Sequence, residues 1–282
     1  MINADFLNQL GKFSLVIYKR VTSNYSGPRR SIAQGAGLVF KDHRIYTPGD
    51  DFRLIDWRVY ARTDDLYIKN YEEERNLTVH VLVDYSQSMN FGKPITKFEY
   101  GSMLGLGFAY LALKENEKFQ FSTFSEDLNV FQPRKGMSQL VSMLQHLNSI
   151  KPEGKSQILK SLMHYKKFLG TRSLVVLISD FLINLDEVID SFQYLSKNEV
   201  KVIQVLDPVE KNLNLEGDYK LKDSESGDLL RTFVSPKLRT EYQSMLDNHS
   251  AKIHETCKTL GYDFHLITTD KPIFDSFYEI LK

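Results

Sequence analysis

The pattern of apolar positions changes near residue 75 of this 282-residue chain. Beyond that point, short apolar runs alternate with longer segments in which apolar residues recur every three or four positions. Runs of the first kind are typical of strands buried on both faces, and segments of the second kind are typical of amphipathic helices. The runs predict strands at 77–83, 118–124, 173–179, 200–206 and 263–268. The other segments predict helices at 97–113, 138–148, 156–169, 186–196, 236–260 and 273–281.

This alternation predicts an α/β fold with a doubly wound, mostly parallel sheet. Gly101 and Gly105 lie in the first predicted helix, where they would let the helix approach the sheet closely. Two short strands are also predicted at 219–222 and 229–233, around a turn of sequence SESG. In a doubly wound sheet, ligands bind beyond the carboxyl ends of the strands. We therefore expect any ligand-binding residues to lie at that edge of the sheet.

Residues 1–75 form a segment of a different kind, rich in Arg, Asp, Tyr and Gly and partly β, which precedes the α/β domain of residues 76–282. The sequence PGDD at 48–51 predicts a turn, and residues 53–61 predict a short helix with Trp57 facing inward. We expect the charged side chains around this helix to form ion pairs with one another: Arg44, Arg53, Arg58 and Arg62 with Asp50, Asp51 and Asp56.

The charges of the chain balance, with 36 Lys and Arg against 36 Asp and Glu. A net charge of zero argues against attraction of the whole molecule to nucleic acid or to anionic lipid, so nucleic acid is an unlikely partner. The balance hides a basic segment, because residues 6–49 carry seven Lys and Arg and a single acid, Asp42. This segment is either a solvated or internally docked face, which we favour, or a nucleic-acid-binding surface.

A single cysteine, Cys257, excludes an intrachain disulfide and predicts a reducing compartment. The uncharged apolar stretch at residues 100–113 is too short for a membrane span and is interrupted by glycine. We therefore expect no membrane span and a cytoplasmic location. His249, His254 and Cys257 share a predicted surface helix, but no fourth zinc ligand lies near them in the sequence.

The strongest chemical signal follows the strand at 77–83, where Asp84, Ser86 and Ser88 form a D-x-S-x-S string. A loop of this kind can turn three oxygen atoms toward one point. Ser156 supplies another hydroxyl, and Asp180 directly follows the strand at 173–179. If the sheet is parallel, these residues share its carboxyl edge. Hard oxygen ligands suit Mg²⁺, with Mn²⁺ or Ca²⁺ as alternatives.

These three segments resemble the metal-ion-dependent adhesion site (MIDAS) of von Willebrand factor A (VWA) domains. That site combines a D-x-S-x-S loop, a distant Thr and an Asp after a later strand. Asp84, Ser86 and Ser88 match the loop, and Asp180 matches the later Asp. Ser156 stands where that family usually has Thr, so it retains the hydroxyl and lacks the methyl group. The resemblance implies that Asp180 would act on the metal mostly through water.

A second resemblance covers residues 29–92. Its motifs are GAGLVF at 35–40, RIY at 44–46, PGDD at 48–51, RLIDW at 53–57, AR at 61–62, LYIK at 66–69 and YEEER at 71–75. They are similar to the signature of the bacterial family called Domain of Unknown Function 58, which joins such a segment to a VWA-like domain. Members of that family are often encoded beside MoxR-type AAA+ ATPases. The resemblance implies an adaptor or assembly factor that works with such an ATPase.

Catalytic motifs fail at specific positions. An aspartyl phosphatase needs an acid where Ser86 stands, a P-loop needs Gly where Ser149 stands, and a dinucleotide fingerprint needs Gly where Phe40 stands.

We therefore predict a non-enzymatic domain that binds an acidic side chain of a protein partner through Mg²⁺. Two alternatives remain open: a metal-dependent phosphoester hydrolase that uses the same carboxylates, and a nucleic-acid-associated protein that uses the basic segment of residues 6–49.

Overall fold

The computed structural model describes residues 2, 6, 9–11, 38–73, 78–131, 136–170, 173–213, 215, 217–222 and 229–282. The chain divides into two units, one made of Met1–Val21 with Leu77–Lys282 and one made of Thr22–Asn76. Residues 1–75 were expected to form one segment. Ile2, Phe6 and Leu10, however, lie in the core of the larger unit.

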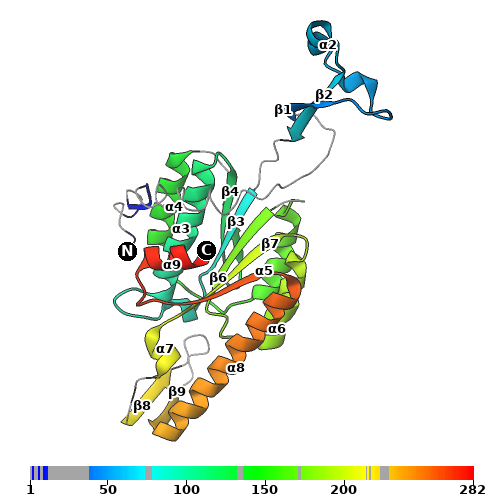
Figure 1. Cartoon of the computed structure of the whole chain (residues 1–282). Helices are drawn as coiled ribbons and strands as arrows, with labels where there is room; N and C mark the ends of the chain where they lie inside the picture. The colour runs from blue at the N-terminus through cyan, green and yellow to red at the C-terminus, as the bar shows by residue number, and fades with distance from the viewer. Residues whose placement is uncertain are drawn as a thin grey trace. The chain divides into compact units, whose positions relative to one another are not determined.

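The larger unit is built on a six-stranded sheet of order β10-β7-β6-β3-β4-β5 (Figure 1). All neighbouring strands are parallel except β5, which pairs antiparallel with β4. The fold class predicted from the alternating pattern is therefore confirmed. The strands are β3 (Thr78–Asp84), β4 (Lys118–Phe124), β5 (Leu128–Val130), β6 (Ser173–Ser179), β7 (Glu199–Leu206) and β10 (Asp263–Thr268). The three-residue edge strand β5 was not predicted, because it is too short to show a pattern.

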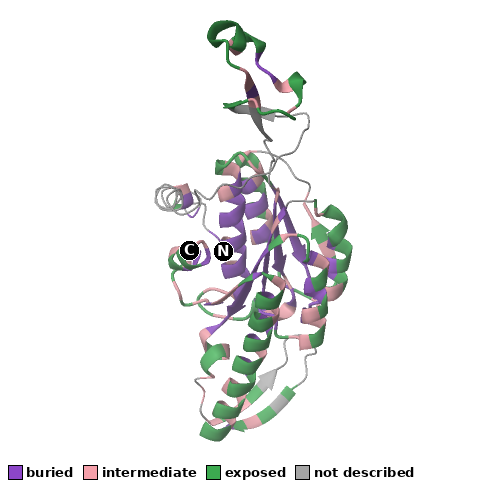
Figure 2. Ribbon diagram, turned by 45° about the vertical axis from the view of Figure 1, so that its right-hand side comes forward, coloured by how far each residue is buried: buried purple, intermediate pink, exposed green. Residues whose placement is uncertain are grey.

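Helices cover both faces of this sheet (Figure 1). One core contains residues of α3 (Lys97–Lys114), α4 (Met137–Ser149) and α9 (Ile273–Ile280). The other contains residues of α5 (Ile158–Tyr165), α6 (Leu185–Phe192) and α8 (Pro236–Leu260). Successive strand residues alternate between the two cores, as Val81 and Leu82 of β3 do. This two-sided burial, purple in Figure 2, explains why the strands read as continuous apolar runs.

Glycines bring α3 close to its neighbours, as predicted for two of them. A Cβ at Gly101 would lie 3.0 Å from Ile178, and one at Gly105 would lie 2.9 Å from Val81. Gly107 makes the closest approach, because a Cβ there would lie 1.8 Å from the ring of Phe277 in α9. The small residues of α3 thus set its distance from the sheet and from the last helix.

The segment between β7 and β10 contains α7 (Pro208–Asn212) and an antiparallel hairpin of β8 (Gly217–Lys222) and β9 (Leu229–Val234). This hairpin and the long helix α8 confirm the two short strands and the helix predicted there. The described residues of this unit also form the 3-10 turns η2 (Gln87–Asn90), η3 (Lys166–Phe168) and η4 (Gln193–Leu195). The helix predicted at 156–169 begins at Ile158, so Ser156 lies in the preceding loop.

The smaller unit pairs β1 (Leu38–Ile45) with β2 (Tyr67–Glu73) in an antiparallel ribbon. Between these strands lie a 3-10 turn, η1 (Phe52–Leu54), and a seven-residue helix, α2 (Trp57–Thr63). The buried apolar residues described here are Ile55 and Ile68. Asp56 accepts hydrogen bonds from the backbone N–H of Arg58 and from the ring of His43, which ties α2 to β1.

One expectation for this unit is wrong, and a second is confirmed only in part. Trp57 is 59% exposed and does not face inward, because the two-stranded ribbon offers too little apolar surface to cover it. Of the expected ion pairs, the described residues form the one between Arg44 and Asp50, at 2.7 Å. Asp51 and Asp56 instead accept backbone N–H groups at the starts of η1 and α2, as capping carboxylates do.

Most of the basic segment, residues 12–37, lies outside the described residues. Among the residues that are described, no helix has the length and apolar character needed to cross a membrane.

Candidate functional site

Asp84 is the centre of the candidate site. It is the last residue of β3 and is fully buried at the carboxyl edge of the sheet. Its Oδ1 accepts the backbone N–H of Ser86 at 2.8 Å, which turns the chain sharply into η2. The hydroxyl oxygens of Ser86 and Ser88 then lie 3.1 Å apart. The D-x-S-x-S string therefore forms the compact oxygen-rich loop that its spacing predicted.

Ser156 reaches the same carboxylate from a separate loop. Its hydroxyl donates to Asp84 Oδ2 at 2.7 Å. Two backbone bonds join this loop to the D-x-S-x-S loop, from Gln87 N to Gly154 O and from Glu153 N to Tyr85 O, each 2.9 Å long. Gly154 has a φ of +75°, which favours glycine at this turn. Ser156 is held at the site by its loop, before the helix begins.

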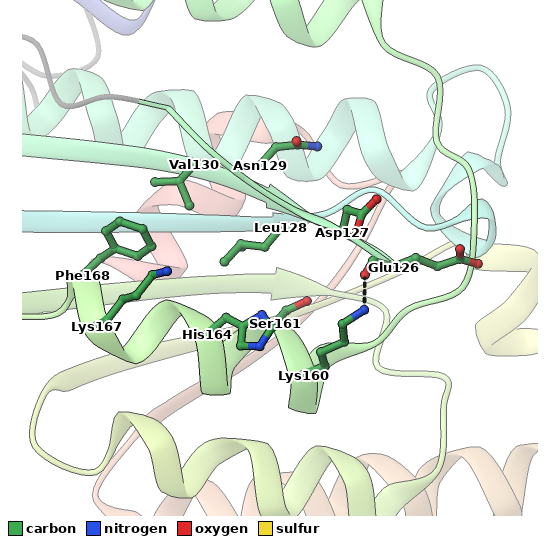
Figure 3. A pocket seen from close by; sticks show the side chains of 10 residues that line it. All are labelled: Glu126, Asp127, Leu128, Asn129, Val130, Lys160, Ser161, His164, Lys167 and Phe168. Carbon is green, nitrogen blue, oxygen red and sulfur yellow. Dashed lines mark hydrogen bonds between the residues drawn. The ribbon is translucent and has the colours of Figure 1, made fainter.

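Glu126 also supports the Ser156 loop. Its Oε1 accepts the backbone N–H of Lys155 at 3.1 Å, while its carbonyl oxygen accepts the ammonium of Lys160 in α5 at 3.1 Å. Figure 3 shows the Lys160 contact beside an open pocket between β5 and α5, into which His164 and Lys167 also project. The lining of the pocket includes none of the predicted site residues.

The carboxyl end of β6 supplies a residue that sequence reasoning missed. The hydroxyl of Ser179 donates to Asp84 Oδ2 at 2.7 Å, so this oxygen accepts hydroxyls from both Ser179 and Ser156. Ser179 Oγ in turn accepts the backbone N–H of Phe181 at 3.0 Å. A serine at the end of a strand carries no distinctive sequence signal, and the pairing of β3 with β6 alone brings it here.

Asp180 lies beside this cluster with both carboxylate oxygens engaged. Oδ1 accepts the backbone N–H of Leu182 at 3.1 Å, and Oδ2 accepts the ammonium of Lys97 at 2.8 Å. Its carbonyl oxygen accepts the side-chain amide of Gln204 at 2.9 Å. The next residue, Phe181, has a φ of +52°, which is a strained conformation for a bulky side chain. These bonds hold Asp180 in one orientation.

Lys97 is the second residue that sequence reasoning missed. It is the first residue of α3 and is fully buried, and its ammonium also contacts Glu210 Oε1 of α7 at 2.6 Å. The sequence did carry one signal, the helical spacing of Lys97 with Gly101, Leu104 and Phe108. In the structure all four residues are buried on one side of α3. A lysine at a helix start is usually exposed, so this spacing alone was not enough to place it in the core.

Burial and charge both act on the ionisable groups of the site. Burial, followed by the negative charge of Asp180, raises the pKa of Asp84 to about 6, against the opposing effect of the hydrogen bonds from Ser86 and Ser179. Burial tends to lower the pKa of Lys97, but the adjacent carboxylates of Asp180 and Glu210 outweigh it, and the pKa of Lys97 is raised. Asp84 is therefore mostly ionised at neutral pH, and Lys97 carries its charge.

The donor set suits a hard cation in its composition. One buried carboxylate, Asp84, lies in hydrogen-bond contact with the hydroxyl of Ser156 and beside the Ser86–Ser88 hydroxyl pair. The described residues contain no group of three or more His, Cys, Asp or Glu side chains that could hold a metal. A cation here would therefore depend on serine hydroxyls, which fits Mg²⁺ or Mn²⁺ better than zinc. Asp180 is near, but its charge is already paired with Lys97.

The other metal candidate does not assemble. Cys257 is buried, and the ring of His249 hydrogen-bonds to the carbonyl oxygen of Phe181 at 2.7 Å. Their helix, α8, was predicted to lie on the surface, but one side of it packs against α6 and the sheet. His254 stacks on Phe264. His249 instead helps to fix the strained backbone that follows Asp180.

Comparison with known proteins identifies the family. A family model described as "Protein of unknown function DUF58" matches residues 42–252, and the chain belongs to this family. It is 25% identical over 267 residues to the uncharacterized protein Rv1480 of Mycobacterium tuberculosis, which covers 93% of this chain and 84% of that protein. It is 24% identical over 136 residues to the uncharacterized protein YeaD of Bacillus subtilis, covering 48% and 32%.

Solved structures with partial similarity to this chain include VWA domains. The SpRpn10 VWA domain has a TM-score of 0.42 and 11% identity, covering 73% of this chain and 95% of that one. A manganese-loaded TRAP protein of Plasmodium vivax has a TM-score of 0.33 and 17% identity, covering 46% and 57%. A mussel byssus matrix protein with a zinc-occupied MIDAS motif has a TM-score of 0.33 and 18% identity, covering 46% and 38%.

One comparison corrects the expected location. A similar structure is described as an aerotolerance-related membrane protein from Bacteroides fragilis, with a TM-score of 0.43 and 17% identity, covering 73% of this chain and 98% of that one. The expectation of a cytoplasmic location, which was drawn from cysteine content and the lack of an apolar span, is wrong. Neither property separates a cytoplasmic protein from the soluble part of a membrane-bound one.

Proposed function

We propose that this chain is a non-enzymatic adaptor or assembly factor that binds a protein partner through a divalent cation at the carboxyl edge of its sheet. Asp84, Ser86, Ser88 and Ser156 would hold the cation, with Asp180 beside it. Mg²⁺ is the favoured ion, with Mn²⁺ or Ca²⁺ as alternatives. The observation that carries this proposal is Asp84 itself: a fully buried carboxylate that accepts the backbone N–H of its own loop and serine hydroxyls from a second loop and a neighbouring strand.

The charge of the site favours binding over hydrolysis. A divalent cation held by one carboxylate and neutral hydroxyls keeps a net positive charge. A carboxylate from another protein can complete its coordination in a charge-assisted contact. Hydrolysis would also need a base near the cation, and the second carboxylate, Asp180, is already bonded to Lys97 and to the Leu182 N–H. The partner is therefore expected to present Asp or Glu.

The identity of the partner follows from family resemblance. Members of this family are often encoded beside MoxR-type AAA+ ATPases, and we propose such an ATPase as the first partner to test. The contact would place an acidic side chain of the partner, or of a protein that the ATPase remodels, at the cation. The open edge of the sheet near Ser88, which is only half-buried, is the side from which such a group can approach.

A pull-down experiment tests this proposal. The full chain is immobilised and challenged with the purified MoxR-type ATPase from the same source, in Mg²⁺ or in excess chelator. Wild type should retain the ATPase in Mg²⁺ and lose it in chelator, while Asp84→Asn should bind weakly in both. Asp190→Ala, which removes an exposed carboxylate on α6, is the matched control and should behave as wild type. Equal retention by wild type and Asp84→Asn in both buffers would contradict the cation-mediated contact.

A further inference from the structure

A fully buried lysine lies beside the candidate metal site. The ammonium of Lys97 contacts Asp180 Oδ2 at 2.8 Å and Glu210 Oε1 at 2.6 Å, and it lies 5.9 Å from the centre of the Phe91 ring. Neither Lys97 nor Asp180 has a solvent-exposed side chain, and that of Glu210 is 18% exposed. Burying an ammonium is costly unless carboxylates compensate its charge. Here Asp180 and Glu210 provide that compensation.

The two carboxylates that hold Lys97 differ in their surroundings. Glu210 belongs to α7, where its second oxygen accepts the backbone N–H of Asp207 at 3.1 Å and completes a capping box. Glu210 is therefore held in place by α7, where its role is to cap the first turn of the helix. Asp180 lies on the side of the site, because it directly follows Ser179, whose hydroxyl donates to Asp84 Oδ2. Lys97 thus joins the start of α7 to the metal-site edge of β6.

The charges of the site can be counted from these contacts. Asp84 and Asp180 would together offer two negative charges to a divalent cation. The Lys97 ammonium pairs with Asp180, which leaves the charge of Asp84 as the main attraction. A cation that approached Asp180 would meet a fixed positive charge bonded to the same carboxylate. At distances of a few ångströms in a buried site, one such charge changes cation affinity strongly.

We propose that Lys97 is a built-in counter-cation of Asp180 that lowers the affinity of the site for a divalent cation. The site then depends on the acidic group of a partner for the missing negative charge, so that cation and partner are held together and released together. This inference rests on the proposed function, since it concerns the same cation site. Lys97 acts through Asp180, which makes it a positioning residue that sets how strongly the site holds a cation.

Binding of Mn²⁺ to the purified full chain, followed by electron paramagnetic resonance, tests the inference. The informative variant is Lys97→Met combined with Glu210→Gln. It removes the ammonium and neutralises Glu210, so that Asp180 is the carboxylate left without its counter-charge. It should bind Mn²⁺ about tenfold more tightly than wild type, or better. Glu210→Gln alone keeps the Lys97–Asp180 pair and is the matched control. Adding Asp84→Asn to the double variant should abolish the gain, which locates it at this site.

A second variant covers the case in which the first does not fold. Lys97→Met combined with Asp180→Asn and Glu210→Gln replaces all three charged groups by neutral groups of similar size. If Lys97 cancels Asp180, this variant should keep an Mn²⁺ affinity within about threefold of wild type. A loss of tenfold or more would show that Asp180 contributes as a ligand despite Lys97, which would overturn the inference. Circular dichroism confirms that each variant is folded.

The outcomes separate this inference from the proposed function. If wild type binds Mn²⁺ in an Asp84-dependent manner and the folded Lys97→Met/Glu210→Gln variant binds it equally or more weakly, the role of Lys97 is refuted and the metal site stands. If neither wild type nor that variant binds Mn²⁺ at millimolar concentration, both the metal site and the role of Lys97 are refuted.

Discussion

Ser179 and Asp84, which are 95 positions apart in the sequence, are joined by a hydrogen bond of 2.7 Å from the serine hydroxyl to Oδ2 of the carboxylate. The bond crosses from β6 to β3, two parallel neighbours whose ends meet at one edge of the sheet. It makes Ser179 part of the candidate site, although the D-x-S-x-S motif does not include it. The orientation of Asp84 therefore depends on the sheet as well as on its own loop.

Replacing Ser179 tests this dependence. Ser179→Ala removes one of the donors to a buried carboxylate and should lower the free energy of unfolding by about 1–2 kcal/mol, as measured by urea denaturation. It should also weaken Mn²⁺ binding, because Asp84 loses its fixed orientation. Ser196→Ala, at an exposed position after η4, should change neither quantity. A Ser179→Ala variant with wild-type stability and wild-type Mn²⁺ affinity would show that this bond does not position the carboxylate.

The raised pKa of Asp84 predicts a dependence of stability on pH. Its pKa is about 6 in the folded protein, above its value of 3.8 in the unfolded chain, so the folded state binds more protons between these values. This stabilising contribution is present at low pH and is lost as pH rises through about 6. It should amount to about 1–3 kcal/mol. Cation binding should show the opposite trend and weaken as pH falls below about 6, because protonation removes the charge.

Comparing wild type with Asp84→Asn isolates the contribution of Asp84 to the pH dependence of stability. Burial lowers the pKa of His80 to about 4, so His80 opposes the trend by destabilising the folded state as pH falls from about 6.5. The free energy of unfolding should therefore be measured between pH 4 and pH 8 for wild type and for Asp84→Asn. The difference, wild type minus variant, should decrease as pH rises. A difference that stays constant across this range would contradict the raised pKa.

The close approach of α3 and α9 predicts a strong effect at Gly107. A methyl group there would overlap the ring of Phe277, so Gly107→Ala should displace α9 and lower the free energy of unfolding by about 1–3 kcal/mol or more. Gly170→Ala places its Cβ 3.8 Å from the nearest atom and should be close to neutral. Chemical denaturation of the two variants makes the comparison. Equal stability would mean that α9 does not pack as described.

The exposure of Trp57 can be measured directly, because it is the one tryptophan of the chain. With 59% of its surface exposed, its fluorescence emission should lie close to that of the unfolded protein and should be quenched readily by iodide. Trp57→Phe should abolish the signal and leave the free energy of unfolding nearly unchanged, since little apolar surface is buried at this position. A blue-shifted emission that iodide does not quench would contradict the exposure of this ring.

Several elements could be predicted from the sequence because their signal is local. The runs around Val81 and Val176 are apolar because both faces of the sheet are covered, and the D-x-S-x-S loop closes through a bond between residues two positions apart. The turn at 48–51 is local as well. The inward orientation of Trp57 was wrong, since a two-stranded ribbon leaves the helix without a covering layer.

The sequence by itself determined the order of strands and helices, the α/β fold class and the presence of Asp84 at a strand end, since each depends on neighbouring residues or on a regular period. The tertiary structure alone decided what surrounds that carboxylate. Ser179 reaches Asp84 because β6 pairs with β3, and Lys97 becomes a buried counter-charge because α3 begins beside both Asp180 and Glu210. These contacts join residues 83 to 113 positions apart, and no local pattern encodes such a distance.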